Sequence, residues 1–138
     1  MYARNDCYTY FTIVGEFDPD EMTQILGLTP EKKWGADDTK GDGSKYGFAH
    51  WEIGRCTDYD FKVENQMEKT ISVLEDKIEI LNFIREHSNV EFYLAVVPFV
   101  CPGEVAPCLA PSLRVIDFCH ATRTKIDIDL YVWNSEEE

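Results

Sequence analysis

Basic residues are scarce in this sequence. Its 138 residues include 13 lysines and arginines against 26 aspartates and glutamates, so the formal net charge at pH 7 is −13. A protein of this charge repels phosphate groups, which argues against DNA, RNA and anionic membranes as partners. The same field favours association with a cation or a basic protein. Acidic charge also maintains solubility, so the charge alone identifies no partner.

Signals for disulfides, zinc, export and membrane insertion are missing as well. The five cysteines are odd in number and contain no Cys-x-x-Cys pair, which argues against a disulfide framework or a zinc site. The first residues lack the apolar segment of a signal peptide, and no apolar run approaches the roughly 18 residues of a membrane span. We therefore expect a cytoplasmic protein with reduced thiols, without a metal or a cofactor.

Apolar residues, by contrast, are abundant. Hydrophobic residues make up 44% of the chain and aromatic residues 13%, which is too rich for a disordered protein. A chain of this length buries about two-thirds of its unfolded surface in one core. We predict a single domain over residues 1–138, with a flexible loop at about 31–47 and an acidic tail at 134–138.

The first half of the chain predicts two strands separated by a helix and a loop. Aromatic and β-branched residues fill positions 7–14, which is typical of a buried strand. Asp18 and Gly27 are suitable caps for a short helix between them. Four glycines among polar residues make 31–47 a loop, and 48–53 is a second strand. The apolar face of the helix is expected to contain Met22, Ile25 and Leu26.

The longest periodic signal lies in the middle of the chain. Apolar residues recur at spacings of three and four over residues 62–87, which predicts an amphipathic helix. Glu75 and Asp76 offer an internal cap, so a single helix and two shorter helices both remain open. Residues 90–100 follow as the strongest strand, and Pro98 near their end suggests a sheet edge or a bulge.

The C-terminal part predicts one more helix and one more strand. Ser112 is a suitable N-cap for a short helix. Residues 125–133 alternate strictly between apolar and polar side chains, which is typical of a half-buried strand. The apolar residues expected on the helix are Leu113, Ile116, Phe118 and Ala121.

Together these elements predict an α+β fold. We expect a mixed or mainly antiparallel sheet of about four to six strands, with the helices packed mainly on one side. The two halves of the chain both follow the order strand, turn, short helix, strand, on either side of the long helical segment. An internal duplication is therefore a further hypothesis.

The chain resembles a known family in an ordered series of motifs. These motifs are Tyr8-x-Tyr10-Phe11, Gly15-x-Phe17-Asp18-Pro19, Leu26-Gly27-Leu28-x-Pro30, Trp34-Gly35, Trp51-Glu52 and Ile126-Asp127-Ile128-Asp129-Leu130-Tyr131. In this order they resemble the bacterial family called domain of unknown function 4279, from about residue 8 to residue 133. The resemblance implies a compact, stand-alone bacterial α+β domain and no particular reaction. Members tend to carry a helix-breaking proline or glycine near the position of Asp76, and this chain departs from that pattern.

Tyrosines lie on three of the predicted strands, and on the last of these strands they lie beside two aspartates. Side chains two residues apart share a face of a strand, so Asp127 and Asp129 lie about 6.8 Å apart. If the three strands are neighbours, their common face suits a lysine or arginine of a partner, through ion pairs and cation–π contacts. In the alternative interpretation several of the tyrosines are core residues. The candidate partner-binding residues are Tyr8, Tyr10, Tyr93, Asp127, Asp129 and Tyr131.

Two tryptophans on either side of the glycine-rich loop suggest a second site. Trp34 and Trp51, with His50 and Glu52, are candidates for a small-ligand pocket that the loop closes. Alternatively, the tryptophans only anchor the loop to the sheet. Cys119 is next to His120, but neighbouring helical residues point about 100° apart, which argues against a nucleophile pair.

Two functions from different classes follow from these residues. The first is a non-enzymatic interaction domain that binds a basic protein, for example an immunity-type protein that neutralises a toxin or effector encoded beside it. The acidic charge and the tyrosine–aspartate face favour it, and no catalytic set is recognisable. The alternative is a small-ligand binding domain or an enzyme with a pocket under the 31–47 loop. The oligomeric state is left open.

Overall fold

The computed structural model describes residues 4–133, so the predicted acidic tail lies outside the described residues. In chain order the elements are β1 (Asp6–Glu16), α1 (Pro19–Leu26), β2 (Lys32–Trp34), β3 (Ala49–Cys56), α2 (Glu64–Ser72), a 3-10 helix (Glu75–Lys77), α3 (Ile78–His87), β4 (Asn89–Val100), α4 (Leu113–Thr122), β5 (Lys125–Ile128) and β6 (Tyr131–Val132). None of the described helices is both long and apolar enough to cross a membrane.

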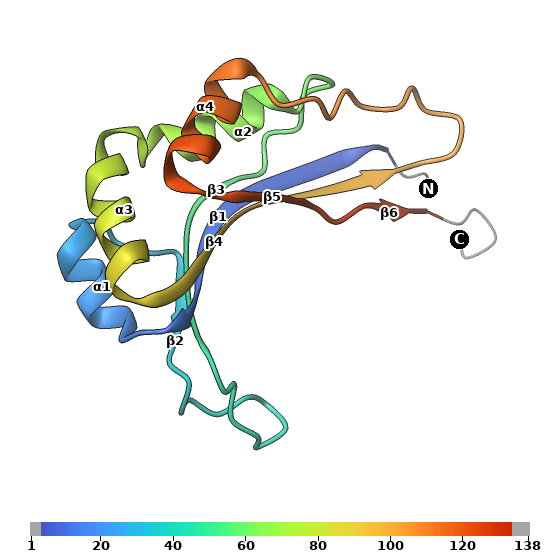
Figure 1. Ribbon diagram of the computed structural model, residues 1–138. Coiled ribbons are helices and arrows are strands. Elements are labelled where there is room, and N and C mark those ends of the chain that lie inside the picture. The colour runs from blue at the N-terminus through green and yellow to red at the C-terminus, as the bar shows by residue number, and fades with distance from the viewer. Residues whose placement is uncertain (1–3, 134–138) are drawn as a thin grey trace.

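The strands form one mixed, open sheet. Its order is β2-β3-β1-β4-β5, and β6 pairs with β4 beyond the end of β5. β1 is antiparallel to β3 and β4, whereas β5 and β6 are parallel to β4. The helices lie on the convex side of the curved sheet, and the concave side faces away from them (Figure 1). The predicted α+β class is therefore confirmed.

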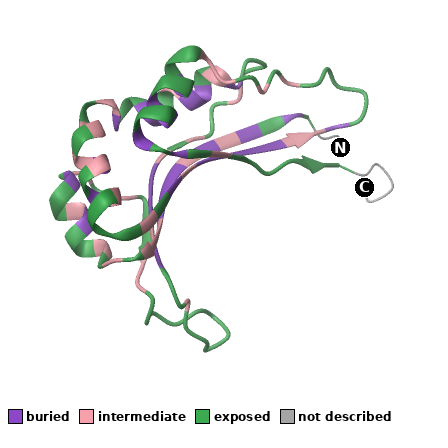
Figure 2. Ribbon diagram, viewed as in Figure 1, coloured by how far each residue is buried: buried purple, intermediate pink, exposed green. Residues whose placement is uncertain are grey.

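The core lies between the sheet and the helices, because successive side chains of a strand point alternately toward the helices and away from them. On β1, Phe11 and Ile13 are fully buried beneath the helices, while Tyr8 and Tyr10 are half-buried on the opposite side. Figure 2 shows this alternation along the central strands. The largest fully buried side chains include Trp51, Phe11, Phe92, Ile13, Leu26 and Met67.

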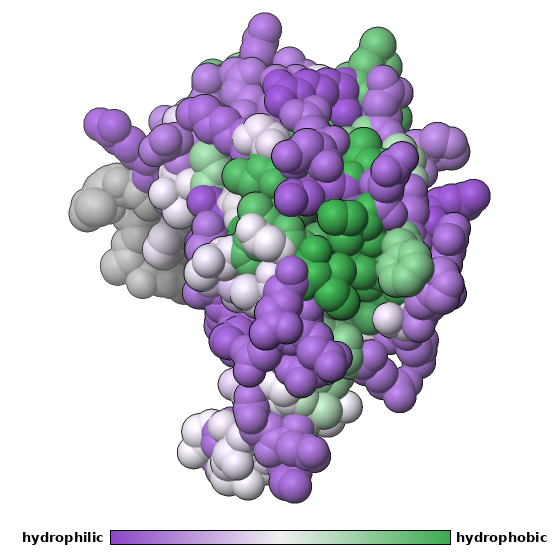
Figure 3. Space-filling model, turned by 90° about the vertical axis from the view of Figure 1, so that its left-hand side faces the viewer, coloured by the Kyte–Doolittle hydropathy of each residue, from purple (hydrophilic) through white to green (hydrophobic). Residues whose placement is uncertain are grey.

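The caps predicted for α1 are those observed. Asp18 accepts a hydrogen bond from the backbone N–H of Asp20, and Gly27 ends the helix with a φ of 66°. Met22 and Leu26 are buried as predicted, but Ile25 is 51% exposed. With Phe83 of α3, it lines a cleft between the two helices. The space-filling view of this side shows an apolar patch at its centre (Figure 3).

The long helical segment is two helices, α2 and α3, separated by the 3-10 helix Glu75–Lys77. The C-terminal helix begins after Ser112, whose side chain accepts a hydrogen bond from the N–H of Val115. Its buried positions include Val115 and Phe118, whereas Leu113 is 77% exposed and Ile116 43%. The helix packs through the face of Val115, Phe118 and Cys119, so two of the apolar residues expected on it, Leu113 and Ile116, lie outside the core.

Two other predictions need correction. The loop predicted at 31–47 begins with β2, which pairs with β3 and is too short to show an alternating pattern. The two halves of the chain also differ in topology, because β1 and β3 are antiparallel whereas β4 and β5 are parallel. The structure therefore shows no internal repeat within residues 4–133.

The single strand predicted at 125–133 is interrupted between β5 and β6. The N–H of Asp129 donates to the carbonyl of Val96. A parallel ladder would continue with the N–H of residue 98 donating to the carbonyl of Asp129, but residue 98 is proline and has no N–H. Pro98 thus lies in an interior strand, not at a sheet edge, and faces the gap between two short strands.

Candidate functional site

The face of the sheet without helices, called the open face below, gathers polar and aromatic side chains in rows. In one row, Thr12 on β1 is paired with Glu52 on β3 and with Tyr93 on β4, and Tyr93 with Lys125 on β5. The next row contains Tyr10, Ala95 and Asp127. Neighbouring strands lie about 4.8 Å apart, so residues in one row are in reach of each other.

A β-bulge in β3 brings Arg55 onto this face. Thr9 is paired with Cys56 and Phe11 with Ile53, so β3 contains one residue more than β1 over this stretch. Gly54, at the bulge, has a φ of 74°, a conformation that glycine adopts more readily than other residues. Without the extra residue, alternation would direct Arg55 to the helix side.

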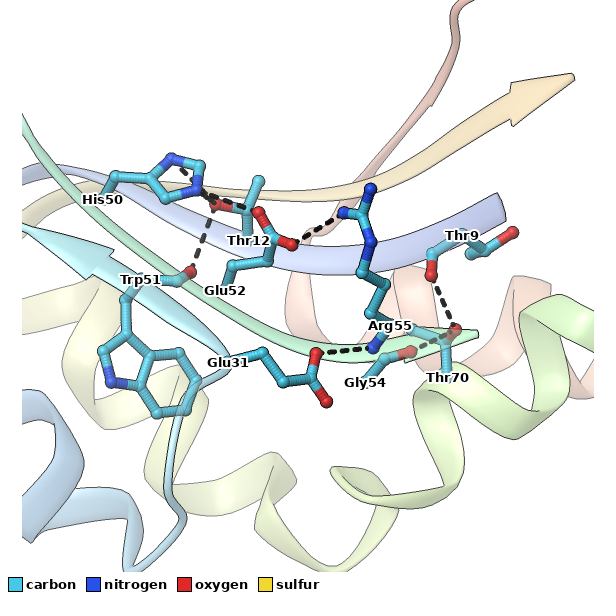
Figure 4. A network of polar contacts seen from close by, with 9 residues as sticks. All are labelled: Thr9, Thr12, Glu31, His50, Trp51, Glu52, Gly54, Arg55 and Thr70. Atoms are coloured by element: carbon cyan, nitrogen blue, oxygen red, sulfur yellow. Dashed lines mark hydrogen bonds and ion pairs between the residues drawn. The ribbon is translucent and has the colours of Figure 1, made fainter. Parts of the chain in front are cut away.

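Glu52 is the centre of a polar cluster on the open face (Figure 4). The residue is only 4% exposed. One carboxylate oxygen lies 3.3 Å from Nε2 of His50, and the other accepts a hydrogen bond of 2.9 Å from Nη1 of Arg55. Burial acts to raise the pKa of Glu52, but the His50 hydrogen bond and the Arg55 charge together outweigh it, and the pKa is lowered. Glu52 therefore stays ionised.

The guanidinium of Arg55 also covers two tyrosine rings. Its central carbon lies 4.2 Å from the ring centroid of Tyr8 and 5.3 Å from that of Tyr10. Both distances are within the range of cation–π contacts. Burial raises the pKa of Tyr10, and the Glu52 charge adds to this effect. One arginine thus has a carboxylate and two aromatic rings as partners.

Next to this cluster, three aromatic rings form a stack. The ring centroid of Trp34 lies 4.1 Å from that of Tyr46 and 4.1 Å from that of His50, with interplanar angles of 17° and 10°. Because both faces of the Trp34 ring are covered, a ligand ring has no free face of this tryptophan to stack on. The stack fixes the base of the 35–48 segment to the sheet.

The β5–β6 end of the open face has the same types of side chain but a different balance of charge. Phe99 and Tyr131 stack with centroids 5.3 Å apart, and Tyr131 donates a 3.0 Å hydrogen bond to Asp129, which raises the pKa of Tyr131. Within residues 4–133, neither Asp127 nor Asp129 forms an ion pair, and no cation lies over Phe99 or Tyr131.

A family model described as Domain of unknown function (DUF4279) matches residues 5–133. The chain belongs to the DUF4279 family. The match spans nearly the whole chain and confirms the resemblance seen in its motifs. Comparisons with curated proteins and with solved structures gave no match.

In this DUF4279 chain the predicted partner-binding residues share one face. Because β1, β4 and β5 are neighbours, the sheet places five of the six candidates on the open face by register, and Asp129 joins them through its bond to Tyr131. Tyr8, Tyr10 and Tyr93 are half-buried, whereas Asp127, Asp129 and Tyr131 are exposed.

The four ligand-pocket candidates do not converge. Trp34, His50 and Glu52 lie together on the open face. Trp51 points to the opposite side, where it is fully buried and its Nε1 donates a 3.0 Å hydrogen bond to Thr23 of α1. A cleft at the start of α1 is lined by Trp34 but by none of the other three.

Sequence reasoning missed Arg55 and Tyr46. The predicted strand ended at residue 53, whereas β3 continues through Gly54 to Cys56. A glycine inside a strand indicates a bulge, so extending the predicted strand past Gly54 would have given the signal for the placement of Arg55. The cysteines bring no further chemistry together: burial raises the pKa of Cys7 and of Cys119 to about 11, which keeps both thiols protonated. Among the described residues, no three histidines, cysteines or carboxylates are grouped to hold a metal ion.

Proposed function

We propose that this DUF4279 chain is a protein-interaction domain that binds a basic segment of a partner protein at the β5–β6 end of its open face. The observation that carries the proposal is that, within the described residues, neither Asp127 nor Asp129 forms an ion pair, although both lie at the same end of the sheet as the Phe99–Tyr131 stack. Carboxylates next to aromatic rings are a favourable setting for arginine and lysine side chains. The net charge of −13 adds long-range attraction.

The chain contains an internal example of this kind of binding. Arg55 is held by the Glu52 carboxylate and by the rings of Tyr8 and Tyr10 on the same face. The β5–β6 end has two carboxylates and two stacked rings. Its two carboxylates, Asp127 and Asp129, are exposed, whereas Glu52, the carboxylate that binds Arg55, is buried. A partner's arginine would therefore find there the partners that Arg55 has inside the chain.

The Glu52 cluster is better explained as part of the scaffold than as a reaction centre. Both of its carboxylate oxygens have partners, and the lowered pKa keeps Glu52 charged. A general base would need a pKa closer to neutral. The covered Trp34 ring likewise does not favour the ligand-pocket alternative. An immunity-type protein that neutralises a basic toxin or effector is one specific form of the proposed function.

The proposal is tested with a synthetic arginine-rich peptide, whose affinity is measured by calorimetry at low and at physiological salt. We expect the double variant Asp127→Lys/Asp129→Lys to bind at least about tenfold more weakly than the wild type, which corresponds to about 1.4 kcal/mol. Its affinity should also depend less on salt.

A matched control separates the site from the total charge. Glu79 and Glu86 are exposed on α3, on the convex side of the sheet. The variant Glu79→Lys/Glu86→Lys changes the net charge by the same amount as the double aspartate variant. We expect it to lose less than about threefold in affinity. Equal losses in the two variants would show that the peptide responds only to net charge, and would overturn the proposal.

A further inference from the structure

The outer edge of β5 and β6 is unpaired within the part of the chain that the structure describes. β5 is the last strand of the sheet, and β6 continues along the same side of β4. The opposite edge of the sheet is the three-residue strand β2. Exposed edges attract further strands, and proteins usually shorten or protect them. The β5–β6 edge is the longer of the two; it contains no proline, and no strand within residues 4–133 covers it.

The backbone of this edge is oriented to accept a strand. The N–H groups of Asp129 and Trp133 donate to β4, to the carbonyls of Val96 and Val100. In an extended strand, the N–H and C=O of one residue point to one side and those of the next to the other. The backbone groups of Ile128 and Val132 therefore point outward, away from β4.

Apolar side chains surround the same edge on the helix side. Ile128 is 41% exposed, Leu130 50% and Val132 66%. A groove of about 440 Å³ runs beside β5, with Ile116, Cys119 and Ile126 among its lining residues. Its remaining lining residues are His120, Arg123 and Thr124. A strand added to β5 would place alternate side chains over this groove, which would bury the exposed apolar surface.

The charges on the other side of the edge select the occupant. Asp127 and Asp129 belong to the open-face positions of the edge. A second copy of this chain would bring its own aspartates and a further net charge of −13 to the interface, and like charges between neighbouring strands are destabilising. A segment with basic residues at alternate positions meets these aspartates with opposite charge.

We infer that the β5–β6 edge binds an extended segment of a protein partner as an additional strand. Its basic side chains contact Asp127 and Asp129 on the open face, and its apolar side chains lie over the groove between β5 and α4. This inference rests on the proposed function and supplies the binding mode for the same basic partner.

The test uses a synthetic peptide that alternates basic with β-branched residues, and the same peptide built from N-methyl residues, which cannot pair with an edge. We expect only the unmethylated peptide to bind, and to slow amide hydrogen exchange at Ile128 and Val132 at least about tenfold. The variant Ile128→Pro removes an N–H that points outward, so the hydrogen bonds that β5 donates to β4 are kept. It should weaken binding at least tenfold, whereas Ile128→Ala, which keeps the N–H, should cost less than about threefold.

The outcomes separate this inference from the proposed function. If both peptides bind equally and the edge amides remain unprotected, strand addition is wrong. The proposed function survives that result only if Asp127→Lys/Asp129→Lys still weakens binding. If the chain alone sediments as a dimer with Ile128 protected, the edge binds a second copy, and the inference is overturned. Failure of the unmethylated peptide to bind at millimolar concentration also overturns it. A thermal melt confirms that the Ile128→Pro variant is folded.

Discussion

The guanidinium carbon of Arg55 lies 4.2 Å from the centroid of the Tyr8 ring. The same guanidinium donates a hydrogen bond to Glu52, whose side chain is only 6% exposed. A single cation thus neutralises a buried carboxylate and orders an aromatic ring beside it. Because an unpaired buried charge is costly, the stability of the open face depends on Arg55, which pairs with the buried Glu52.

Replacing Arg55 with alanine should destabilise the chain by about 2 kcal/mol, because Glu52 loses a charged hydrogen-bond partner in a buried setting. The free energy of unfolding, measured in urea at pH 7, checks this value. Lys33→Ala is the control, since Lys33 pairs with Asp20 through side chains that are 47% and 74% exposed. An exposed pair of this kind contributes less than about 1 kcal/mol. Similar losses in the two variants would contradict the role of Arg55.

Glu52 should make the stability of the chain depend on acidic pH. Its pKa in the folded state is lowered by His50 and Arg55 against the opposing effect of burial, and its pKa in the unfolded state is about 4.3. A lowered folded-state pKa contributes stability above the unfolded pKa, and this contribution is lost as pH falls through the folded pKa.

The comparison between wild type and Glu52→Gln isolates this contribution, because Glu75 and Glu91, whose pKa values are also lowered, are present in both proteins. The difference in unfolding free energy should be at its full, constant value above about pH 6 and should shrink below about pH 4. Urea titrations at a series of pH values measure it. A difference that does not change with pH would show that Glu52 acts only through its shape.

The sequence allowed the common face of the site to be predicted, because alternation along a strand assigns each side chain to a face. The alternation placed Tyr8 and Tyr10 on one face of the first strand and Asp127 on the polar face of the last strand. In the structure, Asp127 lies in the same row as Tyr10. The sheet order was needed to bring these strands side by side, and no local pattern determines it. Arg55 was missed because its position depends on a one-residue bulge, which shifts every later side chain to the other face.

The interruption between β5 and β6 shows a second limit of sequence patterns. Residues 125–133 alternate without a break, yet the ladder stops where the partner strand contains Pro98. The alternation describes one strand only, whereas a ladder needs donors on both strands. The alternation also predicted a strand with its apolar face buried, whereas Ile128, Leu130 and Val132 are exposed. A pattern indicates a face but not whether another element covers it.

Trp51→Ala should destabilise the chain by about 3–5 kcal/mol, the usual cost of truncating a large buried aromatic residue. Trp51 is fully buried, and the substitution also leaves Thr23 without its hydrogen-bond donor. Trp133→Ala is the comparison, since Trp133 is 44% exposed and its loss should cost less than about 1 kcal/mol. Thermal and urea denaturation of the two variants measure both values. A loss at Trp51 as small as that at Trp133 would contradict its place in the core.

Gly54→Ala should destabilise the chain more than a change of backbone preference alone explains. Gly54 has a φ of 74°, and a Cβ atom there would lie 2.8 Å from the backbone carbonyl oxygen of Thr70 in α2. The Thr70 hydroxyl donates to the carbonyl of Gly54, so the helix cannot move away without losing this bond. Gly43→Ala is the matched control, because Gly43 has a φ of 89° with nothing within 4 Å of the added atom.

The control should cost about 1 kcal/mol for its backbone conformation, and Gly54→Ala about 2 kcal/mol more for the clash with α2. Because the bulge at Gly54 places Arg55 on the open face, Gly54→Ala should also weaken the contact between Arg55 and Tyr8, which near-ultraviolet circular dichroism of the tyrosines detects. Equal destabilisation at the two glycines, with an unchanged tyrosine signal, would mean that the close approach of β3 to α2 does not constrain this position.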